Sequence, residues 1–201
     1  MKPSYDLLDA LYFRRQAHSP RTALAVAVPA GPVRVLDICA GTGSNSLAVA
    51  RCRPEAEITA LDHSEQRLRI ARRRFAEAGA TNVAAIAGDA AKTGLPDQAY
   101  DVALLSLALH ELGEDSRMAV IKEARRVLKD DGTLIVVEWE RPRSLFRRAM
   151  FSINQATEPA GFREFLPLDL RAYFAGFGFQ AKARQSCDYT QVLTFRKAVT
   201  L

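Results

Sequence analysis

One stretch constrains this chain more than any other: an apolar run that ends in a carboxylate and a pair of glycines. Residues 33–43 have the sequence VRVLDICAGTG, which predicts a buried strand followed by a tight turn. Having no Cβ, Gly41 and Gly43 can adopt unusual dihedral angles and let a ligand approach the backbone. Residues 44–53 predict a helix whose first N–H groups point back at the turn. A strand, a glycine turn and a helix N-terminus are together typical of a nucleotide site in a doubly wound α/β fold.

Two kinds of nucleotide ligand fit such a turn. The dinucleotide fingerprint G-x-G-x-x-G requires a third glycine, and Ser46 stands in its place. The carboxylate of Asp37 at the strand end suits instead a ligand with an amino group and a positive charge, such as methionine joined to adenosine. Residues 35–43 resemble the first motif of class I S-adenosylmethionine-dependent methyltransferases, in which most members have glycine where this chain has Cys39. Because Cys39 is small, we expect the turn to be kept.

The resemblance implies a specific α/β fold and a cofactor. The fold is a Rossmann-like, seven-stranded, mostly parallel sheet with helices on both faces and a C-terminal antiparallel hairpin, and the cofactor is S-adenosyl-L-methionine. Residues 129–132, with the sequence KDDG, predict a turn before a fifth strand. The strands predicted after the first cover residues 57–62, 82–89, 100–106 and 133–139, and the hairpin covers 179–184 and 189–195.

Carboxylates end the first three predicted strands, at Asp37, Asp62 and Asp89. Parallel strands place their carboxyl ends at one edge of the sheet, where ligands bind. Asp62 follows the glycine turn by about 20 residues, the spacing at which one carboxylate accepts both ribose hydroxyls. A single aspartate at a strand end is usually a turn former, but three of them beside a glycine turn favour a ligand site.

The resemblance also implies individual roles at this edge. Asp89 would accept from the adenine amino group, and the backbone N–H of Ala90 would contact a ring nitrogen. Asp37 would hold the methionine amino group, and His63 would flank the adenine. The full set of predicted cofactor-binding residues is Asp37, Cys39, Ala40, Gly41, Gly43, Asp62, His63, Asp89, Ala90 and Ser106.

The sequence favours a small, partly apolar methyl acceptor. Neither N-P-P-Y nor D-P-P-Y follows the fourth predicted strand, which argues against methylation of adenine in DNA or of protein glutamine. Residues 123–138, EARRVLKDDGTLIVVE, resemble the last motif of the small-molecule branch of the family. Residues 138–142, followed by a Leu-Phe-Arg pattern, resemble the C-methyltransferases of ubiquinone and menaquinone synthesis.

His110 is the predicted catalytic residue. Methyl transfer depends mainly on positioning, and it needs a base only when the acceptor is a hydroxyl or an acidic carbon. An imidazole suits that role because it titrates near neutrality, although His110 could also be a packing residue. Two other functions stay open. A non-catalytic protein could bind the same cofactor, and an NAD(P)-dependent oxidoreductase should show a third glycine and a Tyr-x-x-x-Lys pair, which we do not find.

Length and composition predict one domain over residues 1–201, because 201 residues with 48% hydrophobic side chains can form one full core. Residues 1–30 predict a helical N-terminal cap, and residues 141–165 predict a lid-like insertion. Phe146 and Met150 lie on an apolar stripe of that insertion. The stripe would contact the acceptor, or would pack on the sheet as ordinary core.

The remaining features bear on partners and location. The chain has no apolar run of about 18 residues and no signal-peptide core, so we expect a cytoplasmic protein without a transmembrane segment. Its 3 cysteines lack the spacing of metal ligands, so we expect no metal site. A net charge of +5 and arginine clusters at 67–74 and 141–148 could attract nucleic acid or an anionic membrane surface. We favour instead that Arg67 and Arg74 lie on the solvent side of an amphipathic helix, and the oligomeric state stays open.

Overall fold

The computed structural model describes residues 19–142, 151, 160–187 and 189–198. The predicted N-terminal cap is therefore covered only from Ser19 onward. Of the predicted lid, the described residues are 141–142, Phe151 and 160–165. Phe146 and Met150, the residues of the apolar stripe, lie outside the described ranges.

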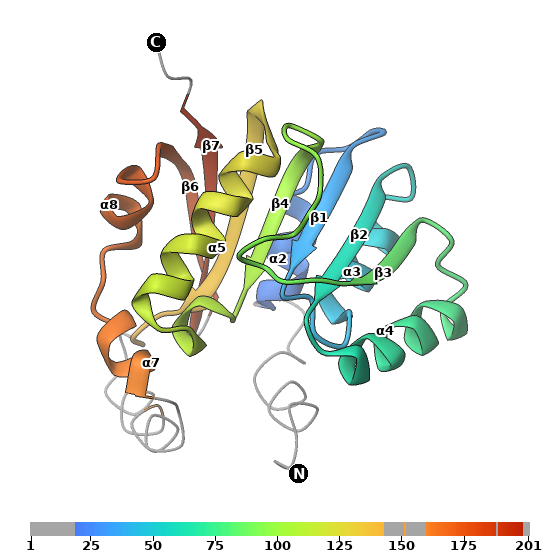
Figure 1. The fold of residues 1–201 in the computed structure, drawn as a ribbon, viewed down its shortest axis with the longest axis horizontal. Coiled ribbons are helices and arrows are strands. Elements are labelled where there is room, and N and C mark those ends of the chain that lie inside the picture. The colour runs from blue at the N-terminus through green and yellow to red at the C-terminus, as the bar shows by residue number, and fades with distance from the viewer. Residues whose placement is uncertain (1–18, 143–150, 152–159, 188, 199–201) are drawn as a thin grey trace.

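A seven-stranded sheet with the order β3-β2-β1-β4-β5-β7-β6 forms the centre of the molecule (Figure 1). The first five strands run parallel, and β7 runs antiparallel to both β5 and β6. This confirms the predicted Rossmann-like α/β fold with a C-terminal hairpin. The strands are β1 Arg34–Ile38, β2 Glu57–Asp62, β3 Val83–Ala87, β4 Tyr100–Ser106, β5 Leu128–Trp139, β6 Phe179–Cys187 and β7 Thr190–Lys197.

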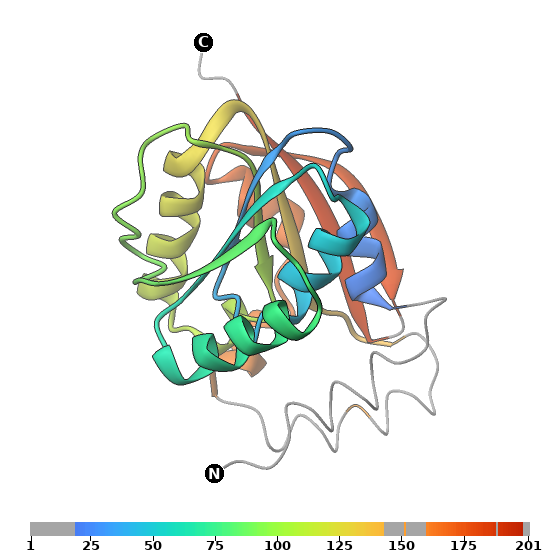
Figure 2. The same ribbon diagram turned by 90° about the vertical axis from the view of Figure 1, so that its right-hand side faces the viewer.

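Helices cover both faces of the sheet (Figures 1 and 2). Successive side chains of β1 point to opposite faces of the sheet, and both faces are apolar. Val35 packs with residues of α2 and α3 on one face, and Leu36 packs with residues of α5 and α8 on the other. In the described ranges, no helix is long and apolar enough to cross a membrane. The helices are α2 Pro20–Ala27, α3 Ser44–Cys52, α4 Glu65–Glu77, the 3₁₀ helix η2 Leu109–Glu111, α5 Glu114–Val127, α7 Ala160–Phe165 and α8 Leu170–Ala175.

The start and end of α4 follow from local sequence signals. The Ser64 hydroxyl caps the helix by accepting from the backbone N–H of Arg67 at 3.4 Å. Ala71 and Phe75 bury the inner side against the sheet. Gly79 ends the helix with a φ of +62°, a conformation that glycine adopts at little cost.

The fifth strand, predicted at 133–139, begins earlier in the structure and includes the residues predicted as a turn. β5 begins at Leu128, directly after α5, and Leu128 pairs with Tyr100 of β4. The next pair joins Val102 to Thr133, so β5 carries extra residues opposite β4 and absorbs the KDDG sequence as a local irregularity. In these registers residues 129–132 have no partner, so the strand is interrupted where the turn was predicted.

Glu123 on α5 fixes the loop that leads from β3 to β4. Its Oε1 accepts from the backbone N–H and the hydroxyl of Thr93 at 2.8 and 2.6 Å. The same oxygen accepts from Nη2 of Arg126 at 2.7 Å, and that nitrogen also donates to the carbonyl of Leu95 at 2.8 Å. The Arg126 guanidinium lowers the pKa of Glu123 from the usual 4.5 to about 2.

This low pKa predicts that Glu123 stabilises the fold fully above pH 4.5, and that its contribution is lost as the pH falls toward about 2. Glu123→Gln should lower the free energy of unfolding at pH 7 by about 1–3 kcal/mol, because it removes hydrogen bonds to a charged group. It should also flatten the decline of stability in that acid range. Urea unfolding at a series of pH values measures both effects. Glu55→Gln at an exposed position should behave like the parent, and identical curves for the parent and Glu123→Gln would contradict the assignment.

Candidate active site

The parallel strands end in register at one edge of the sheet. Ile38 of β1 pairs with Leu61 of β2 and with Leu105 of β4, and Asp62 pairs with Ala87 of β3. β1 lies between β2 and β4, so the order in which strands are added reverses beside it. Open α/β sheets bind ligands at this kind of switch point. The segments after these strands therefore form the candidate site.

The turn after β1 contains three residues in the left-handed region. They are Cys39, Gly41 and Gly43, with φ values of +61°, +57° and +74°. A Cβ at Gly43 would lie 2.5 Å from Cζ of Phe75, so glycine is needed there for α4 to pack. A Cβ at Gly41 would meet no atom within 4 Å, so the backbone is open to a ligand at that point. The turn is kept despite Cys39, but a non-glycine residue in this region costs roughly 1–2 kcal/mol.

Asp62 holds this glycine turn in place. Its Oδ2 accepts from the backbone N–H of Gly41 at 2.8 Å, and its Oδ1 accepts from the N–H of Ser64 at 2.9 Å. The carboxylate is 2% exposed. The backbone N–H of Ala40 donates to the carbonyl of Leu61 at 2.9 Å, which ties the turn to β2 a second time. The structure thus joins two of the predicted regions, the turn and the end of β2.

Asp37 lies under the turn. Its side chain is 1% exposed, and Oδ2 accepts from the Ser46 hydroxyl at 2.5 Å. Burial raises the pKa of this carboxyl from 3.8 to about 6. Ser46 occupies the place of the third glycine of the dinucleotide fingerprint, and here it anchors α3 to the carboxyl at the end of β1. A contact between Asp37 and the methionine amino group stays a prediction.

The predicted adenine-side residues come from the ends of β2 and β3. Asp89 is exposed, and its Oδ1 accepts from the backbone N–H of Ala91 at 2.8 Å. Ala90 is partly buried and packs against the apolar core on the face of the sheet that α5 covers. The His63 side chain is 79% exposed, and its Nδ1 lies 3.6 Å from Oδ1 of Asp62. These positions place the three residues at the same edge as the turn, and their ligand contacts stay predictions.

Arg74 contributes to the turn in a way that helical spacing does not reveal. Its Nη1 donates to the Thr42 hydroxyl at 2.7 Å and to the Ser44 hydroxyl at 3.0 Å. The prediction of a purely solvent-facing side chain was therefore incomplete. Arg74 links α4 to the turn and to the first residue of α3.

His110 lies in a buried ionisable pair. Its Nδ1 lies 2.8 Å from Oε2 of Glu138, and both side chains are almost fully buried. The Glu138 carboxylate also accepts from the backbone N–H groups of Leu109 at 3.0 Å and Trp139 at 3.3 Å. With Nδ1–H donated to Glu138, Nε2 is the acceptor nitrogen of the imidazole, and the indole N–H of Trp139 donates to it at 3.4 Å. Sequence reasoning missed Glu138, although an acidic residue directly after four apolar strand residues is a signal that could have found it.

The chain reaches His110 through a sharp turn after β4. Ser106 ends that strand and is half-buried. Leu107 follows with a φ of +51°, and its N–H donates to the carbonyl of Val137 at 2.8 Å. A branched residue in the left-handed region is unusual and typical of sites held by their surroundings.

An aromatic cluster lies beside His110, and we define it as Trp139, Phe151, Phe162 and Tyr189. Phe162 meets the imidazole edge-on, with ring centres 5.5 Å apart. Phe151 stacks on Tyr189 at 6.2 Å and lies 5.8 Å from Trp139. Phe151 and Phe162 come from the segment predicted as a lid. Apart from its polar contacts with Glu138 and the Trp139 indole N–H, the imidazole therefore lies against aromatic rings.

Comparison with known proteins shows which family this chain resembles. Residues 35–132 match the family described as "Methyltransferase domain". The chain is 30% identical over 144 residues to the demethylmenaquinone methyltransferase of Listeria monocytogenes serotype 4a, covering 71% of this chain and 60% of that protein. It is 33% identical over 141 residues to the demethylmenaquinone methyltransferase of Thermus thermophilus, covering 70% of this chain and 63% of that protein. The chain thus spans less than two thirds of the length of these curated relatives.

Among solved structures, the fold is similar to that of a SAM dependent methyltransferase from Aquifex aeolicus. The TM-score is 0.74 at 17% identity, with 96% of this chain and 94% of that chain covered. The stretch matched to the family includes the glycine turn, Asp62 at the end of β2, Asp89 after β3, and His110. From this match and the strand order we conclude that the chain belongs to the class I S-adenosylmethionine-dependent methyltransferases, whose cofactor is S-adenosylmethionine.

Proposed function

We propose that the protein transfers a methyl group from S-adenosylmethionine to a small acceptor with an aromatic part, and that His110 acts as the general base. The observation that carries the proposal is the buried pair of His110 and Glu138. It lies at the edge of the sheet that also holds the glycine turn. Burial of an ionisable pair has a desolvation cost and is a weak source of stability, so a functional role explains the pair better than packing does.

The residues of the site fit the cofactor. The space at Gly41 is open, so the backbone of the turn can lie along the methionine part. Asp62 would accept the ribose hydroxyls, Asp89 the adenine amino group, and Asp37 the methionine amino group directly or through water. When bound, S-adenosylmethionine supplies a methyl group on a positively charged sulfur. The remaining contacts of the cofactor would be with Cys39, Ala40, Gly43, His63, Ala90 and Ser106.

His110 would remove a proton from an acceptor hydroxyl or acidic carbon. Glu138 holds Nδ1–H, so Nε2 would receive that proton once the indole N–H of Trp139 has moved away from it, and the carboxylate would stabilise the imidazolium that forms. The aromatic cluster would contact the acceptor rings. The relatives are named demethylmenaquinone methyltransferase, so reduced demethylmenaquinone is the first acceptor to test. Non-catalytic binding of the cofactor is the alternative, and the absence of turnover over a broad acceptor panel would favour it.

We expect Asp62→Ala to weaken binding of S-adenosylhomocysteine by about 1–3 kcal/mol, the cost of losing hydrogen bonds to a charged group. Calorimetry measures the affinity, and thermal melting shows whether the variant stays folded. Glu57→Ala is the matched control, because Glu57 lies at the opposite end of the same strand and is exposed. Equal affinities for the parent and Asp62→Ala would refute the ribose assignment.

We expect His110→Ala and Glu138→Gln each to lower the methyl-transfer rate by about 10²–10⁴-fold for an acceptor that must lose a proton. In the parent, the rate should rise with pH as the imidazole loses its proton, and this limb should vanish in His110→Ala. A thiolate acceptor that needs no base serves as the control and should be methylated at nearly the parental rate. A flat pH profile in the parent, together with full turnover in His110→Ala, would contradict the role of His110 as a base and would show that it serves only in packing.

A further inference from the structure

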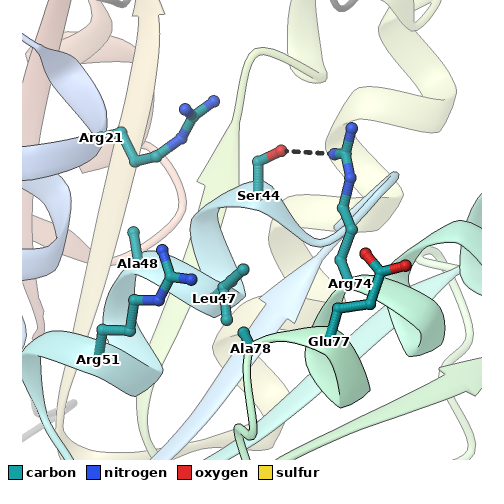
Figure 3. Close-up of a pocket in the computed structure, with 8 residues that line it drawn as sticks. All are labelled: Arg21, Ser44, Leu47, Ala48, Arg51, Arg74, Glu77 and Ala78. Atoms are coloured by element: carbon teal, nitrogen blue, oxygen red, sulfur yellow. Dashed lines mark hydrogen bonds between the residues drawn. The ribbon is translucent and has the colours of Figure 1, made fainter.

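One buried arginine contacts the segment that carries His110. Among the residues that the structure describes, Arg117 is the one buried arginine, with an exposure of 4%. The arginines that line the pocket drawn in Figure 3 are instead exposed or half-buried, and they are Arg21, Arg51 and Arg74. A guanidinium group keeps its charge at all physiological pH values, and taking a charge out of water is costly. The burial of Arg117 therefore calls for an explanation.

The Arg117 guanidinium holds two carbonyl groups of the η2 segment, one on either side of His110. Its Nε donates to the carbonyl of Leu109 at 3.0 Å, and its Nη2 donates to the carbonyl of Leu112 at 2.8 Å. The Leu109 carbonyl belongs to the peptide group that joins Leu109 to His110. Arg117 therefore fixes the backbone at the point where the imidazole is attached.

Glu138 and Arg117 hold Leu109 through opposite groups of its backbone. Oε1 of Glu138 accepts from the Leu109 N–H at 3.0 Å, while Arg117 donates to the carbonyl of the same residue. The other oxygen of Glu138, Oε2, lies 2.8 Å from Nδ1 of His110. Because His110 lies on η2 and Glu138 lies on β5, this last distance depends on where the backbone of η2 is held.

Arg117 also contacts the helix that supplies one ring of the aromatic cluster. Its Cζ lies 4.5 Å from the centre of the Phe165 ring, within the range of a cation–π interaction. Phe165 is the last residue of α7, and Phe162 on the same helix meets the imidazole edge-on. The guanidinium thus touches both η2 and α7, the two elements that bring His110 and Phe162 together.

Packing alone does not account for an arginine at this position. An apolar side chain of similar length would fill the space without the cost of burying a charge. Both hydrogen-bond acceptors of Arg117 are neutral carbonyls, which offset less of that cost than a carboxylate would. The property that distinguishes arginine here is its planar set of N–H groups, which can donate to two carbonyls at once.

We propose that Arg117 is a positioning residue for the methyl transfer, because it fixes the backbone of η2 and so keeps Nδ1 of His110 on the Glu138 carboxylate. The proposal rests on the proposed function, in which His110 is the base. The geometry that Arg117 controls can nevertheless be measured without turnover. Without the two donated hydrogen bonds, η2 would no longer hold the imidazole at the distance at which Glu138 selects its tautomer.

Nitrogen-15 NMR of the full chain, labelled at its 3 histidines, measures this geometry. The His110 signals are those that disappear in His110→Ala. In the parent, we expect the ring proton on Nδ1 and slow exchange of that proton with water, because a buried, hydrogen-bonded proton exchanges only when the structure opens. Arg117→Met keeps the length of the side chain but loses its donors, so exchange should be about tenfold faster or more.

Two further variants complete this measurement. Arg117→Lys keeps the charge but has a single nitrogen instead of the planar fork, so its exchange rate should lie between those of the parent and Arg117→Met. Lys122→Met is the matched control, since Lys122 is an exposed residue of α5 and its substitution removes the same charge. This control should exchange like the parent.

The same variants give a kinetic readout. With an acceptor that must lose a proton, Arg117→Met should lower kcat about tenfold or more, and Arg117→Lys should restore part of the loss. The affinity for S-adenosylhomocysteine should stay at the parental value. The thiolate acceptor, which needs no base, should be methylated at nearly the parental rate.

Parental exchange of the His110 ring proton in Arg117→Met would overturn the proposal, because Arg117 would then only fill space. Equal losses with both acceptors, together with loss of S-adenosylhomocysteine binding, would also overturn it, since they indicate a general loss of structure. If thermal melting shows that Arg117→Met does not fold, Arg117→Lys decides: faster exchange supports the proposal and parental exchange overturns it. Failure of the proposed function is a separate result, seen as full turnover in His110→Ala.

Discussion

The carboxylate of Asp62 is the interaction on which the candidate site depends. It accepts from the N–H of Gly41 in the turn after β1 and from the N–H of Ser64 at the start of α4. One buried anion therefore sets the relative positions of two loops and a helix. Hydrogen bonds to an ionised group are stronger than those between neutral groups. The close packing of Phe75 against Gly43 supports the same arrangement with apolar contact.

Much of the fold could be predicted because each parallel strand is a short apolar run with its own ending, such as Asp62 on β2. The early start of β5 was not foreseen because pairing of Leu128 with Tyr100 is a long-range effect. Long-range contacts also explain why two site residues were not foreseen. The partner of Glu138 is His110, 28 positions away, and the reach of Arg74 to Thr42 cannot be read from helical spacing.

Unfavourable features gather at the edge of the sheet that holds the site. Asp37 is buried on the side of α3, and Glu138 is buried on the side of η2, each with a polar side-chain partner. Cys39 and Leu107, which directly follow the neighbouring strands β1 and β4, both have positive φ values. Buried charge and strained backbone each cost stability, so the apolar core of the rest of the sheet must offset them. That distribution is typical of functional sites.

The pairing of β1 with β4 has a consequence for how the protein is made. Val35 pairs with Val102, so β2, α4 and β3 all lie in the intervening chain. Long-range pairings of this kind close large loops and form slowly. A nascent chain in which only β1, α3 and β2 have left the ribosome already contains Asp62 and the glycine turn. It lacks the side of the candidate site that β4 and η2 form. Because a ligand stabilises only the state that binds it, the cofactor would protect newly synthesised protein only after β4 has joined the sheet.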